Sequence, residues 1–471
     1  MLRLLTKYGI GPLLFALSLV ANHPQVIMLG IVAWMLSWWI SEVVPMGITA
    51  LLPMVLFPLT GIETIREVTA HYANPIIYLF FGGFVLGLAI ERWNLHRRIA
   101  LSIMLRAGNK PRKVILGTML ATALLSTLIS NTATTIMMLP IGLSVVHLLS
   151  QKMEDTAALK PFALAMLLGI AYAANVGGMT TLIGTPPNLV LAGLISEAGL
   201  PEISFARWFV FALPLVIGLF ALLYWLLTRV LLRIHLPVKA GIQDMLKREL
   251  KQLGAMSTAE KRTAMLVGIT AILWMLRPQM STWLNLPALN DTIIAVGMAV
   301  LLFIWPSGKK SKQPLLEWKD TQRLPWGILL LFGGGISIAN GMEQTQIVNR
   351  VGDYISASPI ESVLLMILII TALSIFLTEV MSNVALVSVL IPITLIIAQQ
   401  SGMGEMQLAV PLTLGASCAF MLPISTPPNA IVFGSGHIRT RQMMRVGVGL
   451  NLLFWLLIAL YAYLAVPLFW P

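Results

Sequence analysis

Apolar residues follow one another along this chain in long tracts that contain no charged side chain. The tracts without Asp, Glu, Lys or Arg cover residues 8–22, 26–41, 43–62, 74–90, 114–151, 161–196, 208–228, 263–276, 292–308, 326–342, 362–378, 380–404, 406–438 and 446–471. A helix needs about 20 residues, at a rise of ~1.5 Å each, to cross a bilayer. The pattern therefore predicts an all-α polytopic membrane protein.

Two stretches have the polar centre expected of a re-entrant hairpin. Residues 114–151 as one helix would be about 57 Å long, while the hydrocarbon core is ~30 Å thick. Polar residues 130–132 lie near the middle of this tract, and residues 382–384 occupy the middle of 362–404. Non-helical backbone at that depth must be buried in protein or line a cavity. We expect hairpins over 114–149 and 362–404.

Two further tracts are interrupted by a pair of prolines. Residues 161–196 contain the sequence GTPPN at 184–188, and residues 406–438 contain STPPN at 425–429. Proline lacks a backbone donor and disfavours helical geometry in the residue before it. Each tract is therefore expected to form a broken span.

Three short motifs occur twice in the same order. The second copies of FGG (81–83), SN (130–131) and TPPN (185–188) follow the first by 251, 252 and 241 residues. Repeats of opposite orientation with paired interrupted segments are typical of secondary transporters, whose site lies at the repeat interface. The alternative is that these polar residues only hold helices together. That alternative does not explain Asn at both hairpin centres.

Charge sets the expected topology. The chain is 58% hydrophobic and 11% charged, with a formal net charge of +12. The basic residues fall in four short segments between apolar tracts, near 92–113, 247–262, 309–323 and 439–445. Such loops are cytoplasmic by the positive-inside rule. They do not form one basic face, so no nucleic-acid partner is expected.

The resulting topology has about eleven transmembrane helices and two hairpins, with a cytoplasmic N-terminus and the C-terminus outside. A first helix at 1–25, retained here although a signal peptide is the alternative, precedes a first inverted repeat at 26–235. A cytoplasmic connection at 236–262 leads to the second repeat at 263–471.

The polar tips have the chemistry of a cation and anion site. Ser126 and Ser130 are four residues apart, which would place both on one helical face before the first tip. A sodium ion binds hard oxygen ligands. The tips offer such ligands as hydroxyls, as the amide oxygens of Asn131 and Asn383, and as the carbonyls freed before Pro186 and Pro427. An anion would meet the Thr132 hydroxyl and the N–H groups that begin the following helix.

With these motifs, together with WWISEVVPMGITALLP (38–53) and NPIIYLFFGGFVLG (74–87), the chain resembles the divalent anion/sodium symporter family over nearly its whole length. The resemblance implies a homodimer in the bacterial cytoplasmic membrane, with scaffold and moving transport domains that work as an elevator. It implies a small anionic metabolite, a di- or tricarboxylate, as substrate and Na⁺ as coupling ion, with no organic cofactor. Sodium would bind at two sets of residues: Ser126, Ser130, Asn131 and Gly184, and Thr378, Met381, Asn383 and Ser425. The substrate would contact Ser130, Asn131, Thr132, Thr185, Pro186, Ser382, Asn383, Val384, Thr426 and Pro427.

Val384 departs from the family pattern, because a second SNT motif would place Thr there. This loss of a hydroxyl leaves open which anion is carried, and sodium-independent exchange and sulfate transport remain alternatives. Two intramembrane carboxylates, Glu42 and Glu379, are expected to have structural partners, with proton sensing by Glu379 as the alternative. Scattered histidines and the lack of a phosphate loop argue against an intramembrane hydrolase or other enzyme. A channel is the other alternative to a carrier.

Overall fold

The computed structural model describes residues 2–41, 43–152, 156–234, 241–308, 313–347 and 362–471. Within these ranges the chain forms helices and no strand. Eight of the described helices are long and apolar enough to cross a membrane, and four shorter apolar helices accompany them. The prediction of an all-α polytopic membrane protein is confirmed.

The first half of the chain contains these helices: α1 (Leu2–Val20), α2 (Pro24–Ser41), α3 (Met46–Thr49), α4 (Leu52–Thr60), α5 (Ile65–His71), α6 (Pro75–Arg92), α7 (Leu95–Ala107), α8 (Pro111–Ser126), α9 (Asn131–Lys152), α10 (Thr156–Gly178), α11 (Pro186–Glu197), α12 (Phe205–Trp225) and the π-helix η1 (Leu226–Leu231). The tract 114–151 is therefore two helices joined at residues 127–130. The Pro-Pro sequence begins α11, as expected of a broken span.

The second half repeats this order. It contains α13 (Ile242–Gln252), α14 (Thr258–Trp283), α15 (Asp291–Ile304), the 3₁₀ helix η2 (Trp318–Arg323), α16 (Trp326–Gln344), α18 (Val363–Leu377), α19 (Asn383–Gln400), α20 (Glu405–Ala416), α21 (Pro427–Phe433) and α22 (Thr440–Phe469). The tract 362–404 again breaks at its polar centre. Residues 417–426 separate α20 from α21, where prolines begin the second half-helix.

Some expected elements differ in detail. The tract 43–62 is two short helices, α3 and α4, because Pro53 lies in the first turn of α4 and cannot continue a helix through residues 50–51. The basic segment 92–113, expected as a loop, contains the helix α7. The connection 236–262 contains α13, whose apolar positions Ile242 and Leu246 are buried on one side.

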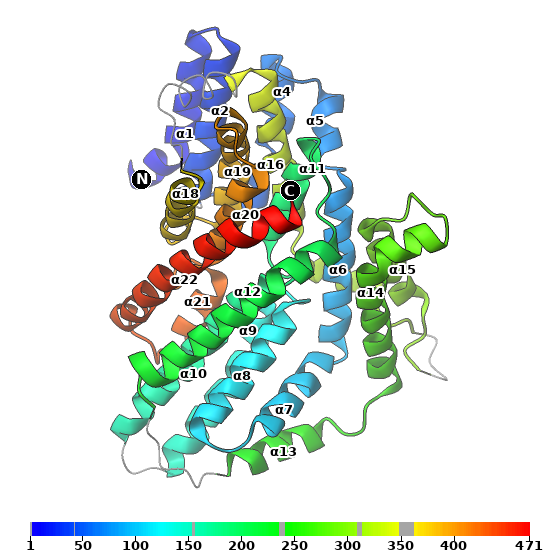
Figure 1. Cartoon of the computed structure of the whole chain (residues 1–471), viewed down its shortest axis with the longest axis vertical. Coiled ribbons are helices and arrows are strands. Elements are labelled where there is room, and N and C mark those ends of the chain that lie inside the picture. The colour runs from blue at the N-terminus through cyan, green and yellow to red at the C-terminus, as the bar shows by residue number, and fades with distance from the viewer. Residues whose placement is uncertain (1, 42, 153–155, 235–240, 309–312, 348–361) are drawn as a thin grey trace.

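Helices α12 and α22, the long helices that end the two halves, run antiparallel where they meet. In Figure 1, α12 and α22 lie side by side across the centre of the molecule. The hydroxyl of Tyr461, late in α22, donates to the carbonyl of Phe211, early in α12, at 2.6 Å. Phe469 and Trp470 pack against the same Phe211. Opposed orientation is what an inverted repeat requires.

The duplicated FGG motifs serve close helix packing. A Cβ on Gly82 would lie 2.7 Å from the backbone of Ala295 in α15, and a Cβ on Gly334 would lie 2.6 Å from the carbonyl oxygen of Ala50. Both neighbours are backbone atoms, which cannot move aside cheaply. The glycines therefore allow α6 and α16 to approach their partner segments, and they have no phosphate-binding geometry.

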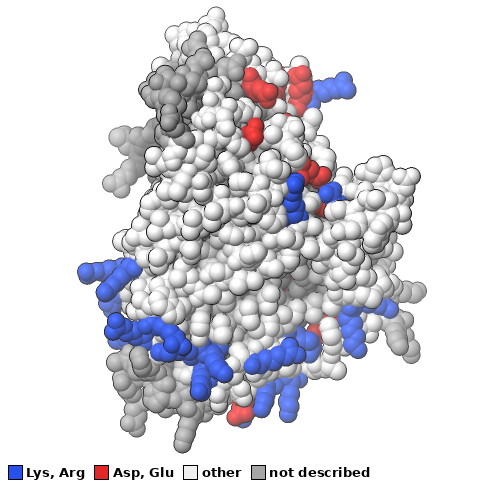
Figure 2. All heavy atoms as spheres, in the orientation of Figure 1, with Lys and Arg blue, Asp and Glu red and all other residues white. Residues whose placement is uncertain are grey.

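Three of the four basic segments meet at one end of the molecule. Arg92 pairs with Glu317 and Asp320, Arg97 with Glu249, and Arg98 Nε lies 2.8 Å from Glu260. Figure 2 shows Lys and Arg gathered over the lower part of this face, while Asp and Glu predominate near its upper end. This clustering is consistent with one common side of the membrane for these segments.

The same end contains an ion-pair network around Glu317. Lys319 Nζ lies 2.6 Å from this carboxylate, and Arg92 lies on its other side. The hydrogen bond from Lys319, followed by the charges of Lys319 and Arg92, holds the pKa of Glu317 below its usual range. These pairs connect η2 to α6 at the basic end.

Cysteine labelling would test the topology in a Cys418→Ser background. Cys418 is buried, whereas Lys110, Gln151, Arg441 and Glu343 are exposed. We expect single cysteines at 110, 151 and 441 to react only with reagent on the cytoplasmic side, and a cysteine at 343 only from outside. Labelling of 110 and 151 from opposite sides would mean that α8 and α9 together cross the membrane.

Candidate functional site

The first candidate site lies where α8 ends and α9 begins. The hydroxyl of Ser126 lies 2.6 Å from one end of the Asn131 side-chain amide. The same end faces the carbonyl oxygens of Ala174 and Gly184, with separations of 3.0 and 3.3 Å, a position that suits the amide nitrogen. The other end of the amide lies 3.4 Å from Asn175 Oδ1. Acceptor oxygens from the hairpin turn, α10 and the α10–α11 break thus converge on one amide.

Ser130 does not share a helical face with Ser126, contrary to the expectation from their spacing. Helix α8 ends at Ser126, and Ser130 is the last residue of the turn 127–130, where it caps the next helix. Its hydroxyl accepts the N–H of Ala133 at 3.3 Å. The turn forms because a polar residue at 130 caps α9 better than it continues α8.

The second tip repeats the first with the same residue spacing. Thr378 Oγ1 lies 2.7 Å from Asn383 Oδ1 and 2.9 Å from the carbonyl oxygen of Ala416. Thr378 and Asn383 follow Ser126 and Asn131 by 252 residues in each case. Each tip therefore has a hydroxyl, an amide oxygen five residues later, and a carbonyl from the neighbouring broken span.

The two breaks are held by the Asn of each TPPN motif. Asn188 Nδ2 donates to the carbonyls of Thr181 and Met179, at 2.9 and 3.3 Å. Asn429 Nδ2 donates to the carbonyls of Ala419 and Leu422, at 2.9 and 3.1 Å. Both amides are fully buried, so they fix the non-helical backbone of each break.

The backbone carbonyl before Pro427, expected to be free for a ligand, already accepts a hydrogen bond within the protein. Thr426 accepts a helical bond from Ala430 at 3.1 Å, and its side chain caps the N–H of Asn429. Thr185 is buried at the matching position before Pro186. In the first break, the carbonyl that faces the tip is that of Gly184, one residue earlier.

The hairpins and the broken spans pack crosswise between the repeats. Helix α9 of the first hairpin contacts α21, and α19 of the second hairpin contacts α11. The starts of these four helices carry the substrate residues expected from the sequence: Ser130, Asn131 and Thr132; Ser382, Asn383 and Val384; Thr185 and Pro186; Thr426 and Pro427. The site residues of each half are thus built against elements of the other half.

The first tip has a cradle that fits a small hard cation. A Cβ on Gly184 would overlap the carbonyl oxygen of Gly178, and one on Gly178 would overlap the side chain of Asn131. Among the described residues no group of three or more His, Cys, Asp or Glu side chains could hold a transition metal. Neutral oxygens of hydroxyl, amide and carbonyl type are what a sodium ion takes.

Of the second predicted sodium set, Thr378 and Asn383 are in direct contact, and Ser425 is joined to them through another residue. The Ser425 hydroxyl donates to Glu379 Oε2 at 2.6 Å, and Glu379 directly follows Thr378. Met381 lies in the same turn, half-buried, with its N–H on the carbonyl of Leu377.

Several site residues had no clear signal in the sequence. Asn175 contacts Asn131 from α10, and Thr181 bridges Thr127 and Gly184 with its hydroxyl, at 2.5 and 3.0 Å. Ala416 contributes only a carbonyl, which sequence cannot reveal. Glu379 has a full set of structural partners, as expected, while Glu42 lies outside the described residues.

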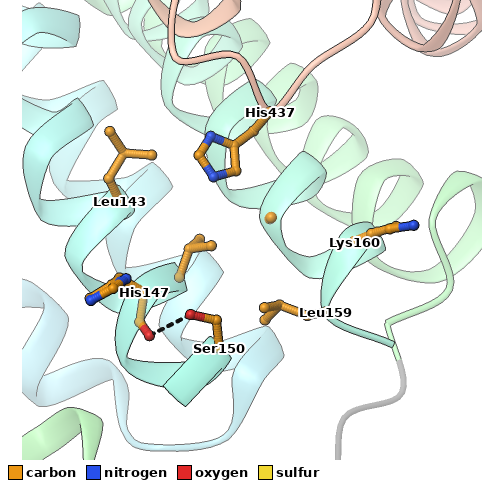
Figure 3. A pocket seen from close by; sticks show the side chains of 8 residues that line it. Leu143, His147, Ser150, Leu159, Lys160 and His437 are labelled. Carbon is orange, nitrogen blue, oxygen red and sulfur yellow. Dashed lines mark hydrogen bonds between the residues drawn. The ribbon is translucent and has the colours of Figure 1, made fainter. Parts of the chain in front are cut away.

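A separate cavity of about 420 Å³ lies away from the tips, near the end of α9 and the start of α10. Figure 3 shows His147 and Ser150 on one wall, with Leu159 and Lys160 opposite and His437 above. None of its lining residues belongs to the predicted substrate or sodium sets. It is therefore distinct from the candidate site.

Known structures share this fold at low sequence identity. The YdaH transporter of Alcanivorax borkumensis matches with a TM-score of 0.56 and 14% identity, over 87% of this chain and 90% of that one. MtrF of Neisseria gonorrhoeae matches with a TM-score of 0.59 and 11% identity, over 94% and 95%. These similarities establish the architecture alone.

Sequence relatives are much closer. The chain is 38% identical to the sodium-dependent dicarboxylate transporter SdcS of Staphylococcus saprophyticus, over 97% of this chain and 90% of that protein. It is also 38% identical to SdcS of Staphylococcus aureus, over 98% and 90%. The model of the sodium:sulfate symporter transmembrane region matches residues 12–470. The chain therefore belongs to this family of membrane transporters, the divalent anion/sodium symporters.

Proposed function

We propose that the protein is a secondary transporter that carries a C4-dicarboxylate or related di- or tricarboxylate across the membrane together with Na⁺. The observation that carries the proposal is the pair of equivalent tips, Ser126–Asn131 and Thr378–Asn383, each with its hydroxyl in contact with the side-chain amide. The names of the SdcS relatives supply the sodium dependence and the substrate class.

Sodium would bind at each tip through neutral oxygens. At the first tip these are Ser126 Oγ, the Asn131 amide oxygen and the Gly184 carbonyl, and at the second they are Thr378 Oγ1 and the Asn383 amide oxygen. Without a cation, the Asn131 amide is satisfied with its nitrogen toward the carbonyls of Ala174 and Gly184, and a bound cation favours the oxygen there instead. Bound sodium would thus fix both amides with their nitrogens turned away from the cation.

The anion would then bind between the tips. The four helices α9, α11, α19 and α21 begin there, and each turns the positive end of its dipole toward that region. The first turns of α9 and α19 also offer backbone N–H groups, whereas α11 and α21 begin with two prolines, which have none. Neither polar strip, 126–138 or 378–388, contains Lys or Arg. Recognition by dipoles and by bound sodium makes anion binding depend on the cation, which is the requirement for symport.

Transport would proceed by an elevator motion in a homodimer. The hairpins and broken spans pack on one another and on α22, which supports their movement as one transport domain. Helices α1–α6 and α14–α16 would form the scaffold. The helices α7 and α13, which pack together at the basic end, would connect the two domains there.

Uptake into proteoliposomes tests this function. The panel contains C4-dicarboxylates, α-ketoglutarate, citrate and sulfate, each with inward sodium or choline and with or without internal substrate. We expect sodium-stimulated uptake of a dicarboxylate without internal substrate. Uptake that needs internal substrate and ignores sodium would instead identify an exchanger, and sulfate alone would change the substrate class.

Val384 provides a prediction about specificity. It is buried in the first turn of α19, at the position that Thr132 occupies in α9. A hydroxyl that bonds a carboxylate contributes about 1.5–3 kcal/mol. Val384→Thr should therefore shift relative affinities among dicarboxylates by about tenfold or more, as measured by competition for uptake.

The reciprocal Thr132→Val change serves as the comparison and should weaken substrate binding at the first tip. If Val384→Thr leaves the competition profile unchanged while Thr132→Val alters it, then Val384 does not face the anion. The second tip would in that case contribute to cation binding and packing alone.

A further inference from the structure

Glu379 is a buried carboxylate with an unusually complete set of donors. It lies in the turn between α18 and α19 and is 2% exposed. One oxygen accepts the N–H groups of Phe420 and Met421, at 2.8 and 2.9 Å, and Asn451 Nδ2 at 2.7 Å. The other accepts the N–H of Leu422 at 3.1 Å and the Ser425 hydroxyl at 2.6 Å.

These contacts join three separate parts of the second repeat. Phe420, Leu422 and Ser425 belong to the break between α20 and α21, and Asn451 lies in α22. The three backbone N–H groups and the Asn451 amide can only donate, while the Ser425 hydroxyl lies 2.6 Å from both the carboxylate and the carbonyl of Leu422. The arrangement therefore suits an acceptor carboxylate and holds the break around it.

No cationic side chain neutralises this anion in the part of the chain that the structure describes. Glu379 takes part in none of the ion pairs found there. A buried charge without an opposite charge is costly, even when dipoles surround it. Its neighbours in sequence and space, Thr378 and Ser425, belong to the second candidate sodium set.

The first repeat has no equivalent charge. The matching position, 252 residues earlier, is Thr127, whose hydroxyl bonds to the carbonyl of Leu124 at 2.7 Å. The matching backbone contact in the first break is made by Thr181, which donates its neutral hydroxyl to the Thr127 carbonyl. The two tips share their hydroxyl–amide pair, and only the second has a carboxylate beside it.

We propose that Glu379 is the positioning residue of the second cation site, and that its fixed charge makes this site bind sodium more tightly than the neutral first site. It sets the position of Ser425 and of the break, and its negative field attracts the ion that binds at Thr378 and Asn383. The inference rests on the proposed sodium coupling and predicts the order in which the two sites bind sodium. The second site should bind sodium at a lower concentration than the first.

The test measures the thermal unfolding of the purified transporter against sodium concentration, with choline chloride keeping the ionic strength constant. A ligand that binds only the folded state raises its stability by mass action. Asn131→Ala isolates the second site, and Asn383→Ala isolates the first. In the Asn131→Ala background, Glu379→Gln should raise the midpoint of the sodium response by about tenfold or more, equivalent to ~1.4 kcal/mol.

Glu379→Asp, which keeps the charge, should retain more of the sodium response than Glu379→Gln. In the Asn383→Ala background, Glu379→Gln should change the midpoint of the sodium response by no more than about twofold. That factor is equivalent to ~0.4 kcal/mol, which is the usual departure from additivity between two independent sites. If Glu379→Gln fails to fold, Asn451→Ala in the Asn131→Ala background takes its place, because Asn451 donates to Glu379 and belongs to neither predicted ligand set, and it should also raise the midpoint.

The outcomes separate this inference from the function on which it rests. Absence of any sodium-specific stabilisation in the unmodified protein would overturn the proposed sodium sites. Normal stabilisation that is equally strong after Glu379→Gln, or after Asn451→Ala if that variant is needed, would overturn only the role of Glu379. Equal shifts in both isolated-site backgrounds would show a general structural effect and would also contradict the inference.

Discussion

Replacing Asn131 or Asn383 by alanine should abolish sodium-driven uptake while leaving the fold intact. Each amide contacts a hydroxyl of its own hairpin and faces a carbonyl or hydroxyl oxygen of the site. Loss of a buried partner costs about 1–3 kcal/mol, more for charged groups, and a loss of ~2.8 kcal/mol corresponds to about 100-fold in binding. We expect uptake in proteoliposomes to fall by about that factor in either mutant.

A matched control is Asn340→Ala, in a different membrane helix. Asn340 Nδ2 donates to the carbonyl of Ile336, one turn earlier in its own helix α16. This substitution removes an amide of the same size away from the tips, so uptake should remain near that of the unmodified protein. Normal uptake in both Asn131→Ala and Asn383→Ala would contradict the proposed function.

The architecture could be predicted because the hydrocarbon core of a membrane permits few backbone structures. Charge-free tracts must form helices, and overlong tracts with polar centres must break. The Pro-Pro sequences at 186–187 and 427–428 begin helices in the structure, as their chemistry requires. The duplicated SN motifs marked the positions of the two turns, and the sodium sets that the resemblance implied contain the pairs Ser126–Asn131 and Thr378–Asn383, which are in contact in the structure.

Other features were beyond prediction because they depend on tertiary contacts. The spacing of Ser126 and Ser130 suggested one helical face, but capping of α9 by Ser130 ends that regularity. The carbonyl contributed by Ala416 has no side-chain signature. The partners of Glu379 lie 41 to 72 residues further along the chain, so a local pattern could mark the residue as unusual without naming them.

The crosswise packing has a consequence for coupling. The first hairpin contacts the half-helix α21, and the second contacts α11, so neither repeat can complete the site alone. In the proposed mechanism, a cation that fixes one tip would also fix the neighbouring break of the other repeat. Sodium binding and anion binding would then depend on each other without a direct contact between the two ions.

Gly184→Ala should also strongly impair transport, for a steric reason. A Cβ there would overlap the carbonyl oxygen of Gly178 and lie 2.9 Å from the carbonyl oxygen of Ser126. Both obstacles are backbone atoms of the site, so relief requires the break to move away from the first tip. Overpacking of this kind costs about 1–3 kcal/mol. We expect the sodium midpoint for uptake to rise by about tenfold or more.

Gly268→Ala supplies the control, since Gly268 lies in α14 and a Cβ there would meet no atom within 4 Å. Alanine has the higher helix propensity by up to ~1 kcal/mol, so this change should leave uptake and its sodium dependence as they are. The comparison separates loss of a glycine in a membrane helix from obstruction of the site. A Gly184→Ala protein with an unchanged sodium midpoint would show that the Gly184 carbonyl does not bind the cation, and the first site would then have to draw its backbone oxygen from Ala174 instead.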